Sequence, residues 1–263
     1  MQTISGQTLS RRSFLFGLCS CCAVLPLVSC ATGSSGGGRG TSLSQQDEIK
    51  LGTESWQRIL QSSHPANNPQ MKQMVYETTK RIVQVAGPDA QGLPWEVELF
   101  ENNEPNAFAL PGGKVGVNTG LFTVAQNQDQ LATVLGHEIR HVTGHHGAKR
   151  YEQAMMTQTG LQLASLALGS SGIQDPGRIM SLLGAGANVG IILPFSREQE
   201  SEADLVGLDY MNAAGFDPRQ SVPFWQRMMQ AGAGNTPSFL SSHPAGQDRI
   251  AALQQRIAAL GKA

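Results

Sequence analysis

The chain has 263 residues, a hydrophobic content of 40% and a formal net charge of −1 at pH 7. A chain of this length and composition can bury the core of one ordinary globular domain. Its charge is nearly balanced and no block of Lys and Arg resembles a phosphate-binding surface, so the composition argues against a nucleic-acid-binding protein.

The first 30 residues are interpreted as a bacterial export signal that lies outside the fold. Arg11 and Arg12 occur in the stretch SRRSFL, which has the pattern of a twin-arginine signal, and an apolar run extends from Phe14 to Val28. The LVSC at the end of this run resembles a lipobox, in which Cys30 is lipidated and becomes the first residue of the mature chain. An ordinary cleaved signal and a transmembrane anchor are the alternatives, although the run is short for a bilayer span.

Residues 31–43 are rich in Gly and Ser and are expected to tether the lipid to a folded domain at residues 44–263. All four cysteines lie at or before Cys30, which excludes a disulfide framework and a cysteine-based zinc site from the mature domain. No Asp follows Cys30, and by similarity to enterobacterial lipoproteins this favours sorting to the outer membrane rather than the inner membrane.

Most of the domain is predicted to be helical, because apolar residues recur at helical spacing in segments that often end at Gly or Pro. The part rich in Ala, Leu and Gly lacks an apolar run of about 18 residues, so core helices or a lid at 160–192 are favoured over a surface that contacts a membrane. The predicted helices are 45–60, 69–86, 121–125, 128–146, 151–168, 179–190, 198–214, 221–230 and 245–260.

A small antiparallel sheet is predicted before the helix at 128–146. Residues 95–100 alternate as a strand, with the side chains of the odd-numbered residues on one apolar face. Two short apolar runs, 107–110 and 114–117, flank a Pro-Gly-Gly turn and therefore predict a β-hairpin.

The stretch LATVLGHEIRHVTGHH carries an H-E-x-x-H pattern within the predicted helix 128–146. His137 and His141 are four residues apart, so both imidazoles lie on one helix face and can bind one metal ion. Glu138 lies beside them, where its carboxylate can reach a water molecule on that ion. The pattern predicts a zinc hydrolase site that still requires a third protein ligand.

The two histidines that follow the pattern do not supply that ligand. The known extended form is H-E-x-x-H-x-x-G-x-x-H, and Gly144 fits it, but the position three residues further on is Gly147. His146 is one residue out of register, so we interpret His145 and His146, together with His64, as surface or structural residues.

A later helix offers a better candidate. Glu200 and Asp204 are four residues apart on one face of the predicted helix 198–214, so Glu200 can bind the metal while Asp204 accepts a hydrogen bond from a ligating imidazole. A solvated acidic helix start is the alternative, since acids favour helix N-termini. The need for a third ligand favours Glu200.

Four stretches occur in a fixed order along the chain: NEPNAFALPGGKVGVNTGL, HEIRH, SREQESEAD and SSHPAGQDRI. Together they resemble the HtpX/CAAX-prenyl-protease type of zinc metallopeptidase, and most of all its soluble bacterial lipoprotein branch (BepA/LoiP-like). The resemblance covers about residues 43–260. It implies a mainly helical, zincin-like (gluzincin) α+β domain that binds one Zn²⁺ per chain.

The resemblance also implies roles for individual residues. By position, His137, His141 and Glu200 match the zinc ligands, Glu138 matches the catalytic acid/base, and Asp204 matches the acid that orients a ligand.

One departure from the family is Arg140, where family members commonly have a small residue such as Ala. Its position on the helix predicts that it points away from the metal, although its charge could alter the site.

His243, followed by Pro244, is a candidate for the donor that stabilises the tetrahedral oxyanion, and the resemblance places this His-Pro pair near the cleft. A related hypothesis is that His243 occupies the open position of the zinc in a resting enzyme and acts as a gate. The alternative is a structural histidine at the entry to the last helix.

Asn106, Ala107, Phe108 and Ala109 are candidates for an exposed sheet edge that binds substrate. An extended peptide can pair with such an edge through main-chain hydrogen bonds, which gives binding with little sequence preference. Plain sheet structure is the alternative.

The sequence therefore predicts a zinc metalloendopeptidase that faces the periplasm from a lipid anchor and degrades misfolded or stalled envelope proteins. The alternative is a protease-like chaperone or assembly factor with little or no proteolytic activity. A purely structural zinc module is disfavoured, because structural zinc sites usually have four ligands. The sequence leaves the physiological substrate and the oligomeric state open.

Overall fold

The computed structural model describes residues 2–4, 43–154, 194–232, 238–244 and 247–261. The predicted export signal, lipobox and Gly/Ser tether lie outside these ranges, apart from the first few residues and Leu43. Most of the predicted helices at 151–168 and 179–190, including the possible lid, also lie outside them. These expectations therefore stay predictions.

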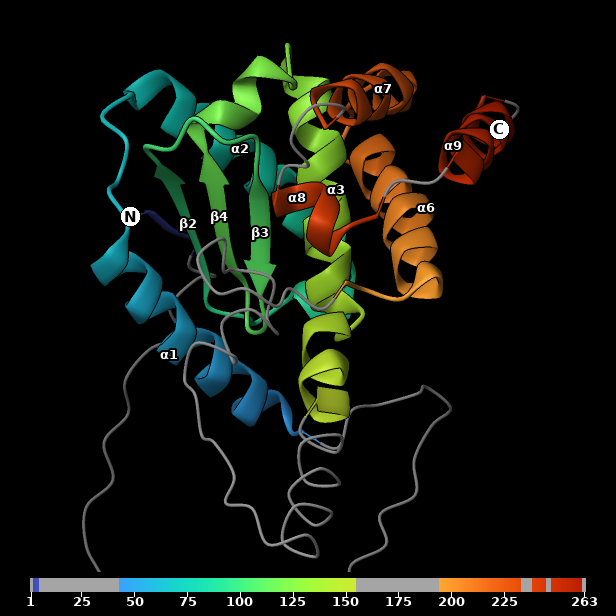
Figure 1. Ribbon diagram of the computed structural model, residues 1–263. Coiled ribbons are helices and arrows are strands. Elements are labelled where there is room, and N and C mark those ends of the chain that lie inside the picture. The colour runs from blue at the N-terminus through green and yellow to red at the C-terminus, as the bar shows by residue number, and fades with distance from the viewer. Residues whose placement is uncertain (1, 5–42, 155–193, 233–237, 245–246, 262–263) are drawn as a thin grey trace, which may run out of the picture. The chain divides into compact units, whose positions relative to one another are not determined.

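A small mixed sheet forms one side of the domain (Figure 1), with the strand order β1 (Gln2–Ile4), β2 (Trp95–Phe100), β4 (Lys114–Asn118) and β3 (Ala107–Leu110). β3 and β4 form the predicted antiparallel hairpin, and β1 is antiparallel to β2. β2 and β4 are parallel, so the prediction of a wholly antiparallel sheet is wrong for this pair. The chain after β2 first builds the edge strand β3, and the hairpin then returns β4 to the place beside β2.

Two helices cover opposite faces of this sheet. α2 (Pro69–Val85) packs on the odd-numbered residues of β2 in the main hydrophobic cluster, which confirms the apolar face predicted from the alternation. α1 (Gln45–Ser62) covers the other face, where the Trp56 ring lies 5.8 Å from Phe100 and 6.3 Å from Phe108 between centroids. The sheet is therefore buried on both faces.

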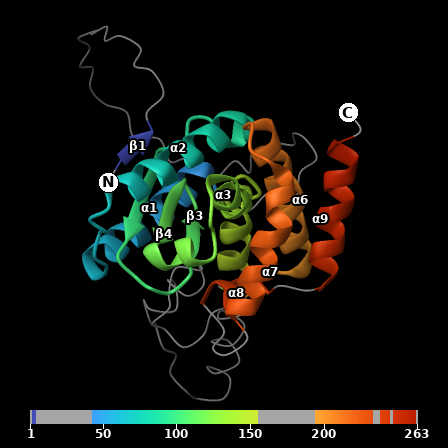
Figure 2. The same cartoon turned by 90° about the horizontal axis from the view of Figure 1, so that it is seen from above.

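α3 (Gln128–Thr143) is the central helix, and Figure 2 shows it between the sheet and α6 (Arg197–Ala213). It ends three residues before the predicted boundary. Gly144 is its C-cap, and His145 adopts a left-handed conformation with φ 55°. Helical backbone resumes at His146, so the predicted single helix is two helices joined by a turn.

α3 and α6 cross with their backbones almost in contact. A Cβ atom on Gly136 would lie 2.6 Å from the carbonyl oxygen of Gly207, and one on Gly207 would lie 2.7 Å from the backbone of Gly136 and of His137. Glu200, Asp204 and Gly207 are spaced i, i+4 and i+7 along α6, so they share one face of that helix. The close crossing therefore points both acids at α3.

The C-terminal part adds helices around this pair, and α9 lies along the side of α6 away from α3 (Figure 2). The short helix α8 was not predicted, and the helix expected at 121–125 is a 3₁₀ turn. Among the described residues, no helix combines the length and apolar character needed to cross a bilayer. The remaining elements are η1 (Pro88–Ala90), η2 (Thr119–Thr123), η3 (Pro218–Gln220), α7 (Ser221–Ala231), α8 (Ser238–Ser242) and α9 (Gln247–Leu260).

The substitution Gly207→Ala is expected to destabilise the fold by about 1–3 kcal/mol, because its Cβ would force α3 and α6 apart. A Gly→Ala change in an unconstrained helix would instead stabilise it by about 1 kcal/mol. Urea unfolding followed by circular dichroism measures the change, with the exposed Ser201→Ala on the same helix as control. A Gly207→Ala protein as stable as the wild type would show that the crossing is not tight.

The ion pair between α1 and the turn after α3 is expected to make stability depend on pH. The Glu48 carboxylate lies 2.9 Å from His145 Nδ1, and this hydrogen bond raises the pKa of His145, with burial in partial opposition. A raised pKa in the folded state gives stabilisation that is complete below the unfolded pKa of about 6.5 and is lost as the pH rises through the folded value.

The stability difference between wild type and His145→Asn should therefore be larger at about pH 5.5 than at about pH 8.5. Asn is the replacement because it tolerates the left-handed backbone. Thermal unfolding of both proteins with chelator present measures this difference, and one that does not change with pH would contradict the assignment.

Candidate active site

Four buried side chains from three parts of the fold converge beside α3. His137 and His141 come from α3, Glu200 comes from α6, and His243 follows α8. One potential ligand atom from each lies within 4.8 Å of the others. The structure thus brings together the predicted ligands and the predicted gating histidine.

The spacing of the three predicted ligands fits a tetrahedral metal ion. His137 Nε2 and His141 Nε2 are 3.0 Å apart, and the Glu200 carboxylate oxygens lie 3.4 Å from His141 Nε2 and 3.6 Å from His137 Nε2. Zinc bonds of about 2.0–2.1 Å in a tetrahedron place neighbouring ligand atoms about 3.3–3.4 Å apart. Two imidazoles and one carboxylate are also the donors that a hydrolytic zinc site uses.

His243 lies at the fourth side of this group. Its Nδ1 is 3.1 Å from His137 Nε2 and 2.8 Å from Glu200 Oε1, while its ring stacks on Phe239 with centroids 4.6 Å apart. Its Nε2 is 3.4 Å from Glu138 Oε1. The ring therefore lies between the ligand group and the candidate general base.

Glu138 is buried, and its two carboxylate oxygens differ. Oε2 accepts a hydrogen bond of 3.0 Å from the backbone N–H of Ala109, whereas Oε1 has no hydrogen-bond partner among the residues that the structure describes. Burial raises the pKa of this carboxyl, opposed in part by His243 and His137. A buried carboxyl whose pKa is raised, and whose Oε1 accepts no hydrogen bond from the described residues, is suited to take up a proton.

Glu200 has the opposite electrostatics. Burial alone would raise the pKa of its carboxyl, but electrostatic attraction to His243 and His137 and hydrogen bonds from His141 and His243 hold it well below its usual range. Glu200 therefore stays ionised, as a carboxylate ligand must.

Asp204 lies where the sequence predicted, with its Oδ1 3.0 Å from His137 Nδ1. Arg249 of α9 donates to Asp204 and, at 2.8 Å, to Glu200 Oε2, and its guanidinium lies 3.7 Å from the ring of Trp225. Sequence reasoning missed Arg249, although it lies in the quoted stretch SSHPAGQDRI. Its spacing along the chain carries no signal, because the contact depends on how α9 packs against α6.

The candidate substrate segment lies at the edge of the sheet beside α3, but it is not exposed as predicted, because Asn106, Ala107 and Phe108 are buried and Ala109 is half-buried. Asn118 N–H donates to Asn106 O, and Ala109 N–H points the other way to Glu138. Because backbone groups alternate along a strand, those of Ala107 point outward with those of Ala109. The Phe108 side chain is buried against α1 instead, so it does not face the site.

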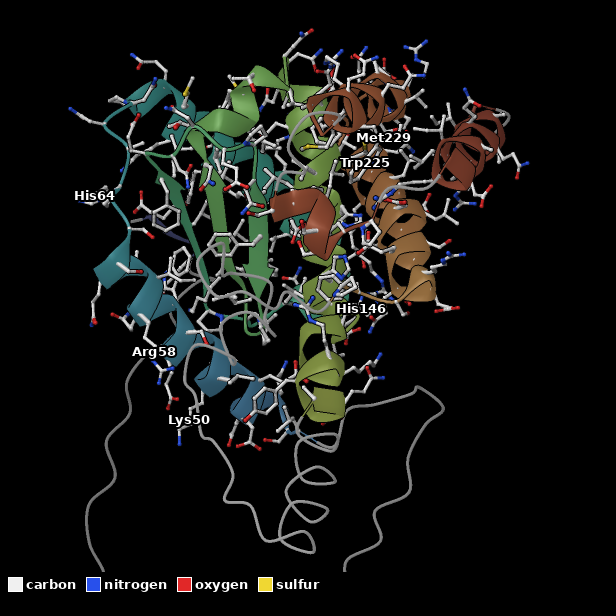
Figure 3. The ribbon with its side chains drawn as sticks, viewed as in Figure 1. Lys50, Arg58, His64, His146, Trp225 and Met229 are labelled. Atoms are coloured by element: carbon white, nitrogen blue, oxygen red, sulfur yellow. The ribbon has the colours of Figure 1, made fainter. Side chains whose placement is uncertain are left out.

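The other residues singled out from the sequence lie as follows. His64 is exposed and lies on the other side of the domain (Figure 3), and His145 pairs with Glu48. His146 is not a surface residue, because only 1% of it is exposed and its ring contacts His141. Arg140 bonds to Glu202 on α6.

Comparison with known proteins gives consistent results. The profile of peptidase family M48 matches residues 61–257. The mitochondrial metalloendopeptidase OMA1 of Schizosaccharomyces pombe is 36% identical over 215 residues, which cover 80% of this chain and 59% of that protein. The beta-barrel assembly-enhancing protease of Escherichia coli K12 is 32% identical over 224 residues, which cover 82% of this chain and 45% of that protein.

The chain thus spans about half the length of the curated relatives it matches. The match confirms the resemblance inferred from the four motifs, and zinc is the metal that this family uses. The mainly helical α+β architecture agrees with it. The chain belongs to peptidase family M48.

Proposed function

We propose that the chain is a zinc-dependent endopeptidase with His137, His141 and Glu200 as its metal ligands. The observation that carries this proposal is the convergence of their ligand atoms, at separations of 3.0 to 3.6 Å, beside Glu138 Oε1, which accepts no hydrogen bond from the residues that the structure describes. Metal ligands and a candidate general base therefore share one buried site.

Peptide hydrolysis needs a water molecule that can readily lose a proton, a polarised carbonyl and a protonated leaving amine. Zinc, when bound, supplies the Lewis acidity that polarises the carbonyl and lowers the pKa of water to about 7. Glu138 takes a proton from the attacking water at Oε1 and passes it to the leaving nitrogen. The Ala109 N–H holds Oε2 and so fixes the direction of Oε1.

The edge strand β3 is proposed to bind the substrate backbone. The outward backbone groups of Ala107 and the carbonyl oxygen of Ala109 can form main-chain hydrogen bonds with an extended peptide, whereas the Ala109 N–H is donated to Glu138. Such bonds do not read side chains, which suits an enzyme that acts on unfolded proteins of varied sequence.

His243 is proposed to act as a gate. Its Nδ1 lies among the ligand atoms and its Nε2 faces Glu138, so the ring fills the space that water and a scissile carbonyl need. Opening requires the segment after α8 to swing the ring away. Once displaced, the same ring could donate to the oxyanion, so the two roles suggested by the sequence are compatible.

The proposed site of action is the bacterial cell envelope. The Arg11-Arg12 signal and the lipobox that ends at Cys30 support export and lipid anchoring, with the outer membrane favoured. A relative is named for enhancing beta-barrel assembly, which supports misfolded or stalled envelope proteins as substrates.

Glu138→Gln is expected to lower proteolysis by about 10²–10⁴-fold, because the amide cannot accept the proton from water. Bound zinc should stay at one per chain, since Glu138 is not a ligand. Casein and an unfolded outer-membrane protein serve as substrates, and metal analysis gives the zinc content. A zinc-loaded wild type that cleaves neither substrate but suppresses their aggregation would refute the protease and favour a chaperone.

His243→Ala tests the gate by its effect on turnover. If the ring blocks the site, removing it should raise the rate of casein cleavage while zinc remains bound through the other three side chains. If its main role is oxyanion donation, the rate should instead fall by about 10²–10³-fold. An unchanged rate would rule out both roles.

A further inference from the structure

A chain of polar contacts runs from His141 to the surface of α6. His146 Nδ1 lies 3.0 Å from His141 Nδ1, and His146 Nε2 lies 3.3 Å from Glu202 Oε2. Arg140 donates to the other oxygen of Glu202, and its second nitrogen lies 3.5 Å from the Tyr210 hydroxyl. Each contact shares a side chain with the next one, so the path is continuous from His141 to Tyr210.

The turn after α3 is built to place His146 there. A Cβ atom on Gly144 would lie 2.6 Å from His146 Nε2, so glycine leaves room for the ring. His145 then adopts a left-handed backbone conformation with φ 55°, and helical backbone resumes at His146. As a result, His146, which is out of register for a direct ligand, contacts the Nδ1 side of the His141 ring.

The protons along this path can be assigned from the contacts. Two imidazole nitrogens at 3.0 Å need one donor and one acceptor. His141 presents Nε2 to the ligand group, so its proton is on Nδ1 and points at His146 Nδ1. The His146 proton is then on Nε2, which faces the Glu202 carboxylate, and every link is satisfied.

The faces of the His141 ring are restrained as well. Phe195 stacks on this ring with centroids 3.9 Å apart. The Arg150 guanidinium in turn lies 3.7 Å from the centre of the Phe195 ring. Stacking limits tilt but allows the ring to rotate within its plane. A hydrogen bond at Nδ1 removes that freedom and directs Nε2.

We propose that His146 and Glu202 are positioning residues that hold His141 in the tautomer and orientation required for metal binding. This proposal rests on the zinc site proposed above. It makes the supports of the two histidine ligands unequal, because His137 is held by the buried Asp204 and Arg249, whereas Glu202 has a side chain that is 44% exposed.

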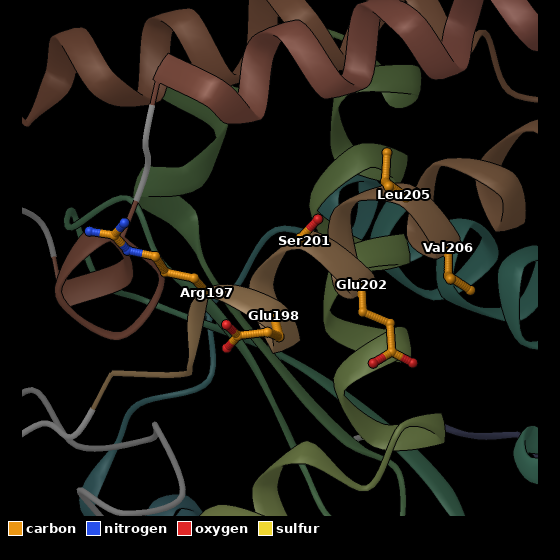
Figure 4. Close-up of a pocket in the computed structure, with 6 residues that line it drawn as sticks. All are labelled: Arg197, Glu198, Ser201, Glu202, Leu205 and Val206. Carbon is orange, nitrogen blue, oxygen red and sulfur yellow. The ribbon is translucent and has the colours of Figure 1, made fainter. Parts of the chain in front are cut away.

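The outer end of this path reaches solvent. Figure 4 shows Glu202 on the outer face of α6, in a shallow pocket that it lines with five other residues. Arg140 lies at this end and bonds to Glu202. Arg140, which stands where the family commonly has a small residue, therefore holds Glu202 toward His146.

The test measures zinc affinity by competition with a chelating dye. His146→Leu keeps the volume but loses both nitrogens, and it should weaken zinc binding by about 10- to 100-fold. His146→Asn retains an acceptor for His141 Nδ1–H and should restore most of the affinity. The visible spectrum of the Co²⁺-loaded protein should change in His146→Leu and return toward the wild type in His146→Asn. His64→Leu removes an exposed histidine and serves as control.

Glu202→Ala gives a second test that does not disturb the core. It should weaken zinc binding by roughly tenfold, whereas Glu198→Ala removes the same charge from an exposed position of the same helix and should have no effect. Equal zinc affinity in wild type, His146→Leu and Glu202→Ala would overturn this proposal and leave the zinc site intact. A wild type that binds no zinc would overturn the zinc site itself, and this proposal with it.

Discussion

The contact between Gly136 and Gly207 is the constraint on which the site depends. Side chains of ordinary size at these positions would keep α3 and α6 roughly 8–10 Å apart, as in most helix pairs. Here the backbones meet, so the short side chains of Glu200 and Asp204 can reach imidazoles on the facing helix. The proposed ligands are therefore brought together by the absence of two Cβ atoms as much as by the presence of His and Glu.

Close assembly brings an electrostatic difficulty. Glu138, Glu200 and Asp204 are all buried around the same histidines, and isolated buried charges are strongly unfavourable. Arg249 compensates two of them from α9, and the histidines hold Glu200 in its charged form. The buried carboxylates favour a divalent cation at the proposed metal site.

Much of this could be read from the sequence where the relevant geometry is local. Helical spacing alone places His137 with His141 and Glu200 with Asp204, and the order of motifs identified the family. Three features were not predicted, because each depends on contacts between distant segments. They are the parallel pairing of β2 with β4, the hydrogen bonds from Arg249 to Asp204 and Glu200, and the position of His146. His146 is the clearest case: its spacing excluded a direct ligand, but the left-handed turn that aims it at His141 has no distinct sequence signal.

The hydrogen bond from Ala109 to Glu138 ties the general base to the strand that is proposed to hold the substrate. This N–H of β3 is thereby occupied, so a peptide bound as proposed along this edge would have one main-chain hydrogen bond fewer, at the position of Ala109. The same hydrogen bond joins α3 to β3, so the proposed base and the proposed substrate strand are linked by a direct contact rather than through intervening side chains.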